Sequence, residues 1–187
     1  MKHYKAIFLD WDDTIGDWTN AEHKALRDIY VQYRLDVLYP TFQDYLNAYK
    51  PYNLELWGMY GHFSVLPGAA EAVRELAKRY PLTIISNGFK EVQYYKFEHS
   101  GLEDCLTHTI ISEEVGINKP QPEIFRIALE LNGVSAEQAL MIGDSYSSDI
   151  AGAKNAGIDQ VWLHEGDADE TATYIVPRLS DVVDILK

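Results

Sequence analysis

Residues 8–14 read FLDWDDT, and in this stretch three carboxylates, those of Asp10, Asp12 and Asp13, follow the end of an apolar run. Like charges this close together repel one another, and burial would increase the repulsion. The segment is therefore either a solvated acidic turn or a site whose charge is neutralised by a cation. The organisation of the remaining chain distinguishes these two interpretations.

Short apolar runs rich in strand-forming residues recur at residues 4–9, 82–85, 109–111, 140–142 and 160–163. Helical patterns lie between them at residues 69–80, 90–100, 122–131 and 148–156, and Ser180 is placed to cap a last helix. Strands separated by single helices predict an α/β fold with a Rossmann-like three-layer α/β/α core, in which a parallel sheet has helices on both faces. In such sheets, ligands bind beyond the carboxyl ends of the strands.

Residues 16–63 depart from this alternation, because no strand pattern occurs there. Thr19 and Glu22 have capping-box spacing before a helical period, a second helix is expected after Thr41, and a third over residues 54–60. We therefore expect a core made of residues 1–15 and 64–187, with residues 16–63 inserted after the first strand as a small helical cap. Aromatic residues are concentrated in this insertion, and we expect most of them to build its core.

Composition excludes several classes of protein. The net charge of −13 argues against binding to nucleic acid polymers or anionic membranes, since both depend on clustered Lys and Arg. The single cysteine, Cys105, excludes an intramolecular disulfide and a cysteine-based zinc cluster, which favours a reducing compartment. No apolar run approaches the ~20 residues of a membrane span, and the N-terminal apolar stretch is too short for a signal peptide. We expect a cytoplasmic protein.

Polar residues follow four of the predicted strands. They are Asp10, Asp12 and Asp13 after the first strand, Ser86 and Asn87 after the second, Lys119 after the third, and Asp144 and Asp149 of GDSYSSD after the fourth. The carboxyl ends of parallel strands meet at one edge of the sheet, so these residues are expected to converge. Mg²⁺ prefers an octahedral array of oxygens, often one or two carboxylates with waters and a substrate phosphate. Asp10, Asp144 and a backbone carbonyl can supply such ligands, so a cation is the favoured interpretation of the acidic stretch.

The motifs FLDWDDT, ISN (residues 85–87), KP (residues 119–120) and GDSYSSD occur in the order of the four motifs of the haloacid dehalogenase-like (HAD) hydrolase superfamily, which the chain resembles over nearly its whole length. The insertion lies where the C1-type cap of that family lies. SNGFKEVQ, KPQPEIF, LMIGDS and ATYIVP are similar to the branch that contains pyrimidine 5′-nucleotidases. The resemblance implies a Mg²⁺-dependent phosphomonoester hydrolase acting on a small phosphorylated metabolite, with a nucleoside 5′-monophosphate as first choice. A phosphosugar phosphatase or mutase is one alternative, and a catalytically weak metal-binding regulatory module is another.

The resemblance also implies roles for individual residues. Asp10 resembles the nucleophile that forms an aspartyl-phosphate, and Asp12 resembles the general acid and base whose carbonyl oxygen also binds Mg²⁺. Asp144 is expected to bind Mg²⁺, and Asp149 either binds it through water or orients another group. Asp13 is expected to act structurally or in substrate discrimination. The residues expected to hold the phosphate are Thr14, which would also position its loop, Ser86, Asn87 and Lys119. Simpler roles in turns, in helix caps or on the surface remain open for Asp12, Ser86, Asn87, Lys119 and Asp149.

The cap departs from the family pattern. In the nucleotidase-like branch it is a four-helix bundle, and a segment similar to YNLELWGMYG is followed by two further helices before the chain returns to the core near VLPGAAEAV. Here HFS (residues 62–64) follows at once. Either the cap is minimal, which would leave a more open site with broader specificity, or a mobile segment of the cap is absent from the sequence as given. We favour a minimal cap.

Overall fold

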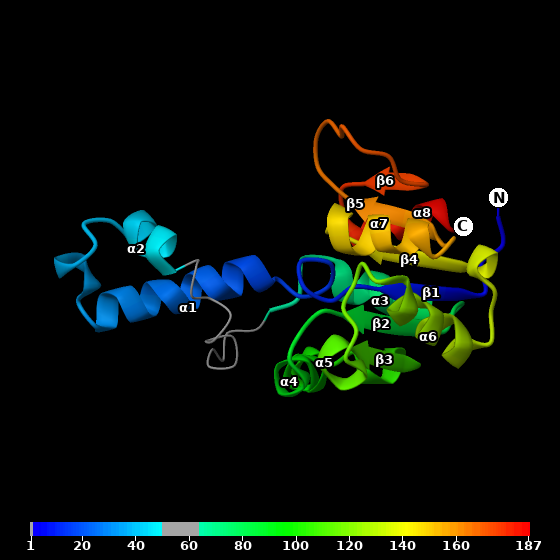
Figure 1. The fold of residues 1–187 in the computed structure, drawn as a ribbon, viewed down its shortest axis with the longest axis horizontal. Helices are drawn as coiled ribbons and strands as arrows, with labels where there is room; N and C mark the ends of the chain where they lie inside the picture. The colour runs from blue at the N-terminus through cyan, green and yellow to red at the C-terminus, as the bar shows by residue number, and fades with distance from the viewer. Residues whose placement is uncertain (1, 50–63) are drawn as a thin grey trace.

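The computed structural model describes residues 2–49 and 64–187, and its centre is one parallel sheet (Figure 1). The strands are arranged in the order β3-β2-β1-β4-β5-β6. Their bounds are β1 Ala6–Leu9, β2 Leu82–Ser86, β3 His108–Ile111, β4 Ala139–Gly143, β5 Asp159–Leu163 and β6 Tyr174–Val176. Five of these strands were predicted from the sequence, and the sixth, β6, was not.

The sheet is covered on both faces because alternate residues of β1 point into two separate hydrophobic clusters. Ile7 and Leu9 pack with α3 (Ala69–Ala77), α4 (Lys90–Ser100) and α8 (Leu179–Ile185). Ala6 and Phe8 pack with α6 (Pro122–Asn132) and α7 (Ala151–Asn155) on the opposite face. Every residue of β1, β2 and β4 is buried, as is typical of central parallel strands. The predicted three-layer α/β fold is confirmed.

Shorter helical turns complete the core. They are α5 (Ser112–Val115), the 3₁₀ turns Glu103–Cys105 and Ala136–Gln138, and a π-helical turn at Tyr146–Ile150 that leads directly into α7. The predicted helix at residues 148–156 therefore begins with a π turn and becomes α-helical only at Ala151. Within residues 2–49 and 64–187, no helix combines the length and the apolar character that a membrane crossing requires.

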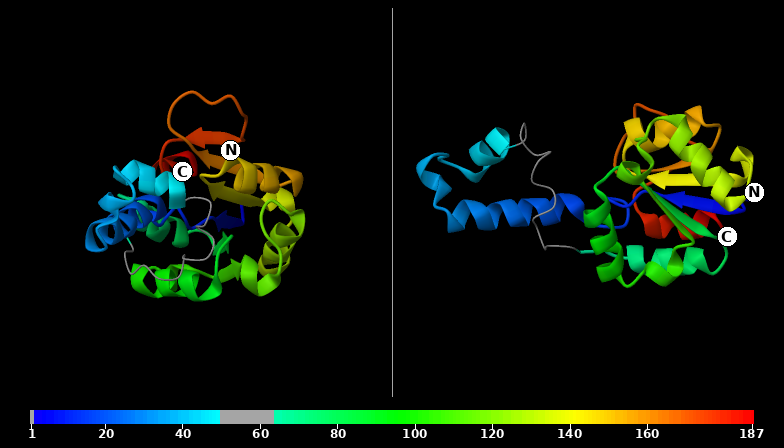
Figure 2. Two further views of the ribbon diagram at one scale, coloured as in Figure 1. Left: turned by 60° about the vertical axis from the view of Figure 1, so that its left-hand side comes forward. Right: turned by 60° about the horizontal axis from the view of Figure 1, so that its bottom comes forward.

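Two helices project away from the sheet, α1 (Trp18–Gln32) and α2 (Phe42–Tyr49), joined through a 3₁₀ turn at Leu35–Val37 (Figure 2). The expected capping box at Thr19 is wrong. The helix begins one residue before Thr19, and its N-cap is Asp17, whose carboxylate accepts a hydrogen bond from the backbone N–H of Asn20. Both the N–H and the hydroxyl of Thr19 donate instead to the carboxylate of Asp13, at 2.9 and 2.7 Å. Asp13 therefore secures the start of α1.

The projecting helices have a small hydrophobic cluster of their own, formed by Leu26, Leu46 and Tyr49 with Phe42 and Tyr45 packed against them. Aromatic rings make much of this contact, as expected, and the Tyr30 ring lies 5.7 Å from those of both Phe42 and Tyr45. The helix expected at residues 54–60, and the return to the core that bears on the length of the cap, lie outside the described residues. The division of the chain into core and cap stays a prediction.

Candidate functional site

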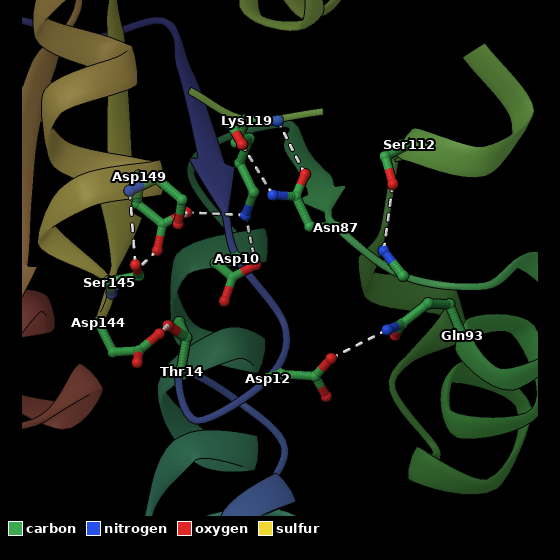
Figure 3. Close-up of polar contacts among 12 residues, drawn as sticks. Asp10, Asp12, Thr14, Asn87, Gln93, Ser112, Lys119, Asp144, Ser145 and Asp149 are labelled. Carbon is green, nitrogen blue, oxygen red and sulfur yellow. Dashed lines mark hydrogen bonds and ion pairs between the residues drawn. The ribbon is translucent and has the colours of Figure 1, made fainter. Parts of the chain in front are cut away.

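Three carboxylates meet at the carboxyl edge of the sheet (Figure 3). Asp10 follows β1, Asp144 follows β4, and Asp149 lies in the π turn. Pairing of Leu9 with Ile142 brings the ends of these two strands side by side. Each carboxylate has an oxygen within 4.8 Å of the other two. Neighbouring ligands of an octahedral Mg²⁺ ion lie ~2.9 Å apart and opposite ligands ~4.2 Å apart, since each bond is ~2.0–2.1 Å long. The three carboxylates are therefore grouped closely enough to be candidates for the surroundings of one cation.

Lys119 lies between two of these carboxylates. Its ammonium nitrogen is 2.5 Å from Asp10 Oδ1 and 2.7 Å from Asp149 Oδ1, and all three side chains are largely buried. The side chain of Asn87 holds Lys119 from behind: its Nδ2 donates to the Lys119 carbonyl at 2.9 Å, and its Oδ1 accepts from the Lys119 N–H at 2.8 Å. Because the Asn87 side chain is used in this way, its backbone N–H is the better candidate for the predicted phosphate contact.

Burial and mutual repulsion control the protonation of the cluster. Burial raises the pKa of Asp10 well above its usual value; nearby Lys119 opposes this effect, whereas Asp149 adds to it. Burial, with the charges of Asp149 and Asp13, raises the pKa of Asp144 to about 6. Burial disfavours the charge of Lys119, but Asp10 and Asp149 outweigh it and raise the pKa of Lys119 above its usual value. One ammonium thus faces three carboxylates, and a divalent cation would relieve the excess negative charge.

Asp149 is held in place by protein donors. Its Oδ2 accepts from the Ser145 N–H at 3.1 Å, and its Oδ1 lies within 3.3 Å of the Ser148 hydroxyl in addition to Lys119. The Asp149 carboxylate also lies directly against the backbone of Gly143, because a Cβ atom added at Gly143 would be 2.3 Å from Asp149 Oδ2. Asp149 is fully buried. These contacts favour the orienting role over direct coordination, between which the sequence did not decide.

Asp12 lies apart from the three-carboxylate cluster. In Figure 3 its side chain points away from Asp10, toward α4. Its Oδ2 accepts from Nε2 of Gln93 at 2.9 Å, and its Oδ1 is 2.6 Å from the ammonium of Lys96. Neither Gln93 nor Lys96 was expected at the site from the sequence. The available signal was their spacing of three residues, which places both on one face of a helix that follows a strand end.

Ser86 and Thr14, both expected to contact phosphate, differ in their surroundings. The hydroxyl of Ser86 is buried, with 1% of the residue exposed, and has no hydrogen-bond partner in the described part of the chain. A buried hydroxyl without a partner is costly, so a ligand oxygen is a natural partner for it. Thr14 is fully buried, and its hydroxyl donates to Asp144 Oδ1 at 3.3 Å. In this arrangement Thr14 positions the Asp144 carboxylate, and its expected contact with phosphate stays a prediction.

The chain is similar to several known proteins. The family of haloacid dehalogenase-like hydrolases matches residues 14–163. A pyrimidine 5′-nucleotidase of Escherichia coli, YjjG, is 29% identical over 84% of this chain and 85% of its own. A glyceraldehyde 3-phosphate phosphatase of Pyrococcus furiosus is 29% identical over 100% of this chain and 95% of its own. That alignment spans 228 positions against 187 residues here, so the relative has insertions.

Among solved structures, magnesium-bound HAD-hydrolase YfnB of Bacillus subtilis covers 99% of both chains, with a TM-score of 0.81 and 28% identity. The resemblance inferred from the motifs is therefore confirmed by sequence and by fold. A match over most of the chain, together with the polar strand ends of the sheet, shows that this protein belongs to the haloacid dehalogenase-like hydrolase family.

Proposed function

We propose that this HAD-family phosphatase is a Mg²⁺-dependent phosphomonoesterase with Asp10 as nucleophile and Asp12 as general acid and base. The observation that carries the proposal is the position of Asp10. Its buried carboxylate lies at a strand end, 2.5 Å from the Lys119 ammonium and within one cluster with Asp144 and Asp149. Such a carboxylate is directed and neutralised by its neighbours, as a nucleophile for a phosphoryl group needs to be.

The reaction divides into two displacements. A carboxylate oxygen of Asp10 attacks phosphorus, the bond from phosphorus to the leaving oxygen breaks, and Asp12 donates a proton to the departing alcohol. Asp12 then takes a proton from water, which attacks phosphorus and releases inorganic phosphate and free Asp10. The ammonium of Lys119 and the hydroxyl of Ser86 are placed to hold phosphoryl oxygens during both steps.

Asp10, Asp144 and the backbone carbonyl of Asp12 would hold the Mg²⁺ ion, with Asp149 orienting Lys119 and the loop around Ser145. When bound, the ion supplies positive charge next to the phosphoryl oxygens and weakens repulsion between the phosphate and the carboxylates. The chain's own residues are then left with positioning and proton transfer.

The substrate we favour is a nucleoside 5′-monophosphate, on the strength of the motifs shared with the nucleotidase-like branch and the similarity to YjjG. A phosphosugar is the second candidate, because the similarity to the glyceraldehyde 3-phosphate phosphatase extends over the whole chain. Initial rates on a panel of nucleoside monophosphates and phosphosugars would rank these two classes. A preference for phosphosugars in kcat/KM would overturn the first choice.

The catalytic proposal is tested by hydrolysis of p-nitrophenyl phosphate with and without Mg²⁺. We expect Mg²⁺-dependent turnover by the wild type and none by Asp10→Asn. The control Asp104→Asn, which alters an exposed carboxylate in the 3₁₀ turn before β3, should keep wild-type rates. Label from ³²P-labelled substrate should be recovered on Asp10 after acid quench. Near-normal turnover by Asp10→Asn would refute the covalent route. Mg²⁺ binding by a wild type that hydrolyses nothing on the panel would instead favour the regulatory module.

A further inference from the structure

Lys96 occupies an unusual position for a lysine. It lies on α4 with only 5% of its surface exposed, yet it is directed at the loop after β1. Its ammonium is 2.6 Å from Asp12 Oδ1 and lies 4.1 Å from the centroid of the Trp18 ring. Trp18 is the first residue of α1, the helix that projects from the core. Lys96 thus contacts Asp12, the proposed general acid, and also Trp18, where the projecting helix α1 begins.

Gln93 completes the contact with Asp12. It lies one turn before Lys96 and donates to the other carboxylate oxygen, Oδ2, at 2.9 Å. Gln93 is itself confined, because a Cβ atom at Gly88 would lie 2.4 Å from its Nε2. Both oxygens of Asp12 are therefore engaged by one face of α4.

The helix that carries these two residues is firmly placed against the catalytic loop. Phe97, next to Lys96, meets the ring of Trp11 edge to face with centroids 4.6 Å apart, and Trp11 lies between Asp10 and Asp12 in the sequence. Burying an ammonium costs free energy unless charged and polar partners compensate it. Asp12 and the Trp18 ring are such partners, so the ammonium is held where it can direct the carboxylate.

We propose that Lys96, assisted by Gln93, is the positioning residue for the general acid Asp12. It holds the carboxylate on the α4 side of Asp10, opposite to Asp144 and Asp149 (Figure 3). The leaving group of the substrate is thereby assigned to the space between Asp10 and α4, near the base of α1. This inference rests on the proposed phosphatase function and extends it to two residues of α4 to which that proposal gives no role in holding the phosphate or the metal ion.

Leaving groups distinguish positioning of the acid from a purely structural role. An alkyl alcohol needs a proton as it departs, whereas p-nitrophenolate departs readily without one. The value of kcat/KM reports steps up to the first irreversible one, here formation of the aspartyl-phosphate. A residue that positions the acid should therefore affect kcat/KM for an alkyl phosphate much more than for p-nitrophenyl phosphate. General loss of structure would affect both alike.

The variants are Lys96→Met and Gln93→Met, measured on glycerol 2-phosphate and p-nitrophenyl phosphate at saturating Mg²⁺. Since general acids contribute about 10²–10⁴-fold, we expect Lys96→Met to lower kcat/KM about 10–100-fold for the alkyl ester and less than about threefold for the aryl ester. Gln93→Met should show the same selectivity with a smaller loss. The matched control is Lys90→Met on the same helix, which breaks the exposed pair with Glu114 and should change neither value.

A second measurement uses the Asp12→Asn background. If Lys96 acts through Asp12, adding Lys96→Met to Asp12→Asn should produce no further selective loss for the alkyl ester. An unchanged ratio of kcat/KM between the two esters, whether both values fall or neither does, would overturn the positioning role. A selective loss for the alkyl ester that is fully additive in the Asp12→Asn background would overturn it as well. These results leave the proposed function intact as long as the wild type turns over both esters through Asp10. Absence of turnover by the wild type would refute both proposals. Should Lys96→Met fail to fold, Gln93→Met alone decides by the same criterion.

Discussion

Replacing Lys119 with methionine is expected to destabilise the metal-free protein strongly. The ammonium of Lys119 is 2.5 Å from Asp10 and 2.7 Å from Asp149, and the Lys119 side chain is only 2% exposed. Methionine retains most of the side chain's volume but leaves two buried carboxylates without their shared cation. Because burial already raises the pKa of Asp10, loss of Lys119 should raise it further and favour the protonated form.

Removing one partner of a buried ion pair costs roughly 3–5 kcal/mol. In a protein of this size each kcal/mol lowers Tm by about 2–4 °C, so the metal-free variant should melt roughly 6–20 °C below the wild type at neutral pH. The loss should be smaller in acid, where protonation of the carboxylates removes the uncompensated charge. Mg²⁺ should restore part of the stability, since it neutralises the same groups by binding to the native state.

The assay is thermal unfolding followed by circular dichroism, in chelator and in Mg²⁺, at acidic and neutral pH. The matched control is Lys78→Met, which breaks a pair with Glu75 in which both side chains are exposed and should leave Tm unchanged. A Tm for metal-free Lys119→Met equal to that of Lys78→Met at neutral pH would refute the argument that Lys119 neutralises the cluster.

Three further outcomes are expected. The pKa of Asp144 is raised to about 6 in the folded protein, so the stability that protonated Asp144 contributes to the metal-free state is present below about pH 4 and is lost as pH rises through about 6. The gain in Tm from Mg²⁺ should therefore increase across the same interval of pH. A gain in Tm that does not depend on pH would contradict this. Gly143→Ala should lower stability by about 1–3 kcal/mol and weaken Mg²⁺ binding, because the new Cβ would lie 2.3 Å from Asp149 Oδ2; urea unfolding and a Mg²⁺ titration measure both effects, and wild-type values for both would show that Asp149 can move freely. Asn87→Ala should lower kcat by about tenfold or more with a smaller change in Tm than Lys119→Met, because the two hydrogen bonds that hold the Lys119 backbone are lost while its charge remains; unchanged kcat on p-nitrophenyl phosphate would show that these bonds are dispensable.

Much of the core was predictable because its signals are local. Apolar runs and helical periods identified five of the six strands, and the predicted bounds of the helix at Lys90–Ser100 agree with the structure. β6 has three residues, none of them fully buried, so no buried-strand pattern marked it. At α1 the expected cap failed because Asp13, six residues before Thr19, takes both of the Thr19 donors. A capping-box pattern considers only neighbours within the helix's first turn.

The sequence by itself determined that Asp10, Ser86, Lys119 and Asp144 belong to one edge, since each follows a predicted strand and parallel strands end together. Only the tertiary structure decided which of these side chains touch. The pairing of Lys119 with both Asp10 and Asp149, and of Lys96 with Asp12, joins residues between 30 and 109 positions apart. Such contacts depend on the rotation and distance of one packed element relative to another. Neither is encoded in a period of two or of 3.6 residues, because that period identifies the buried face of an element and not the residue it will meet.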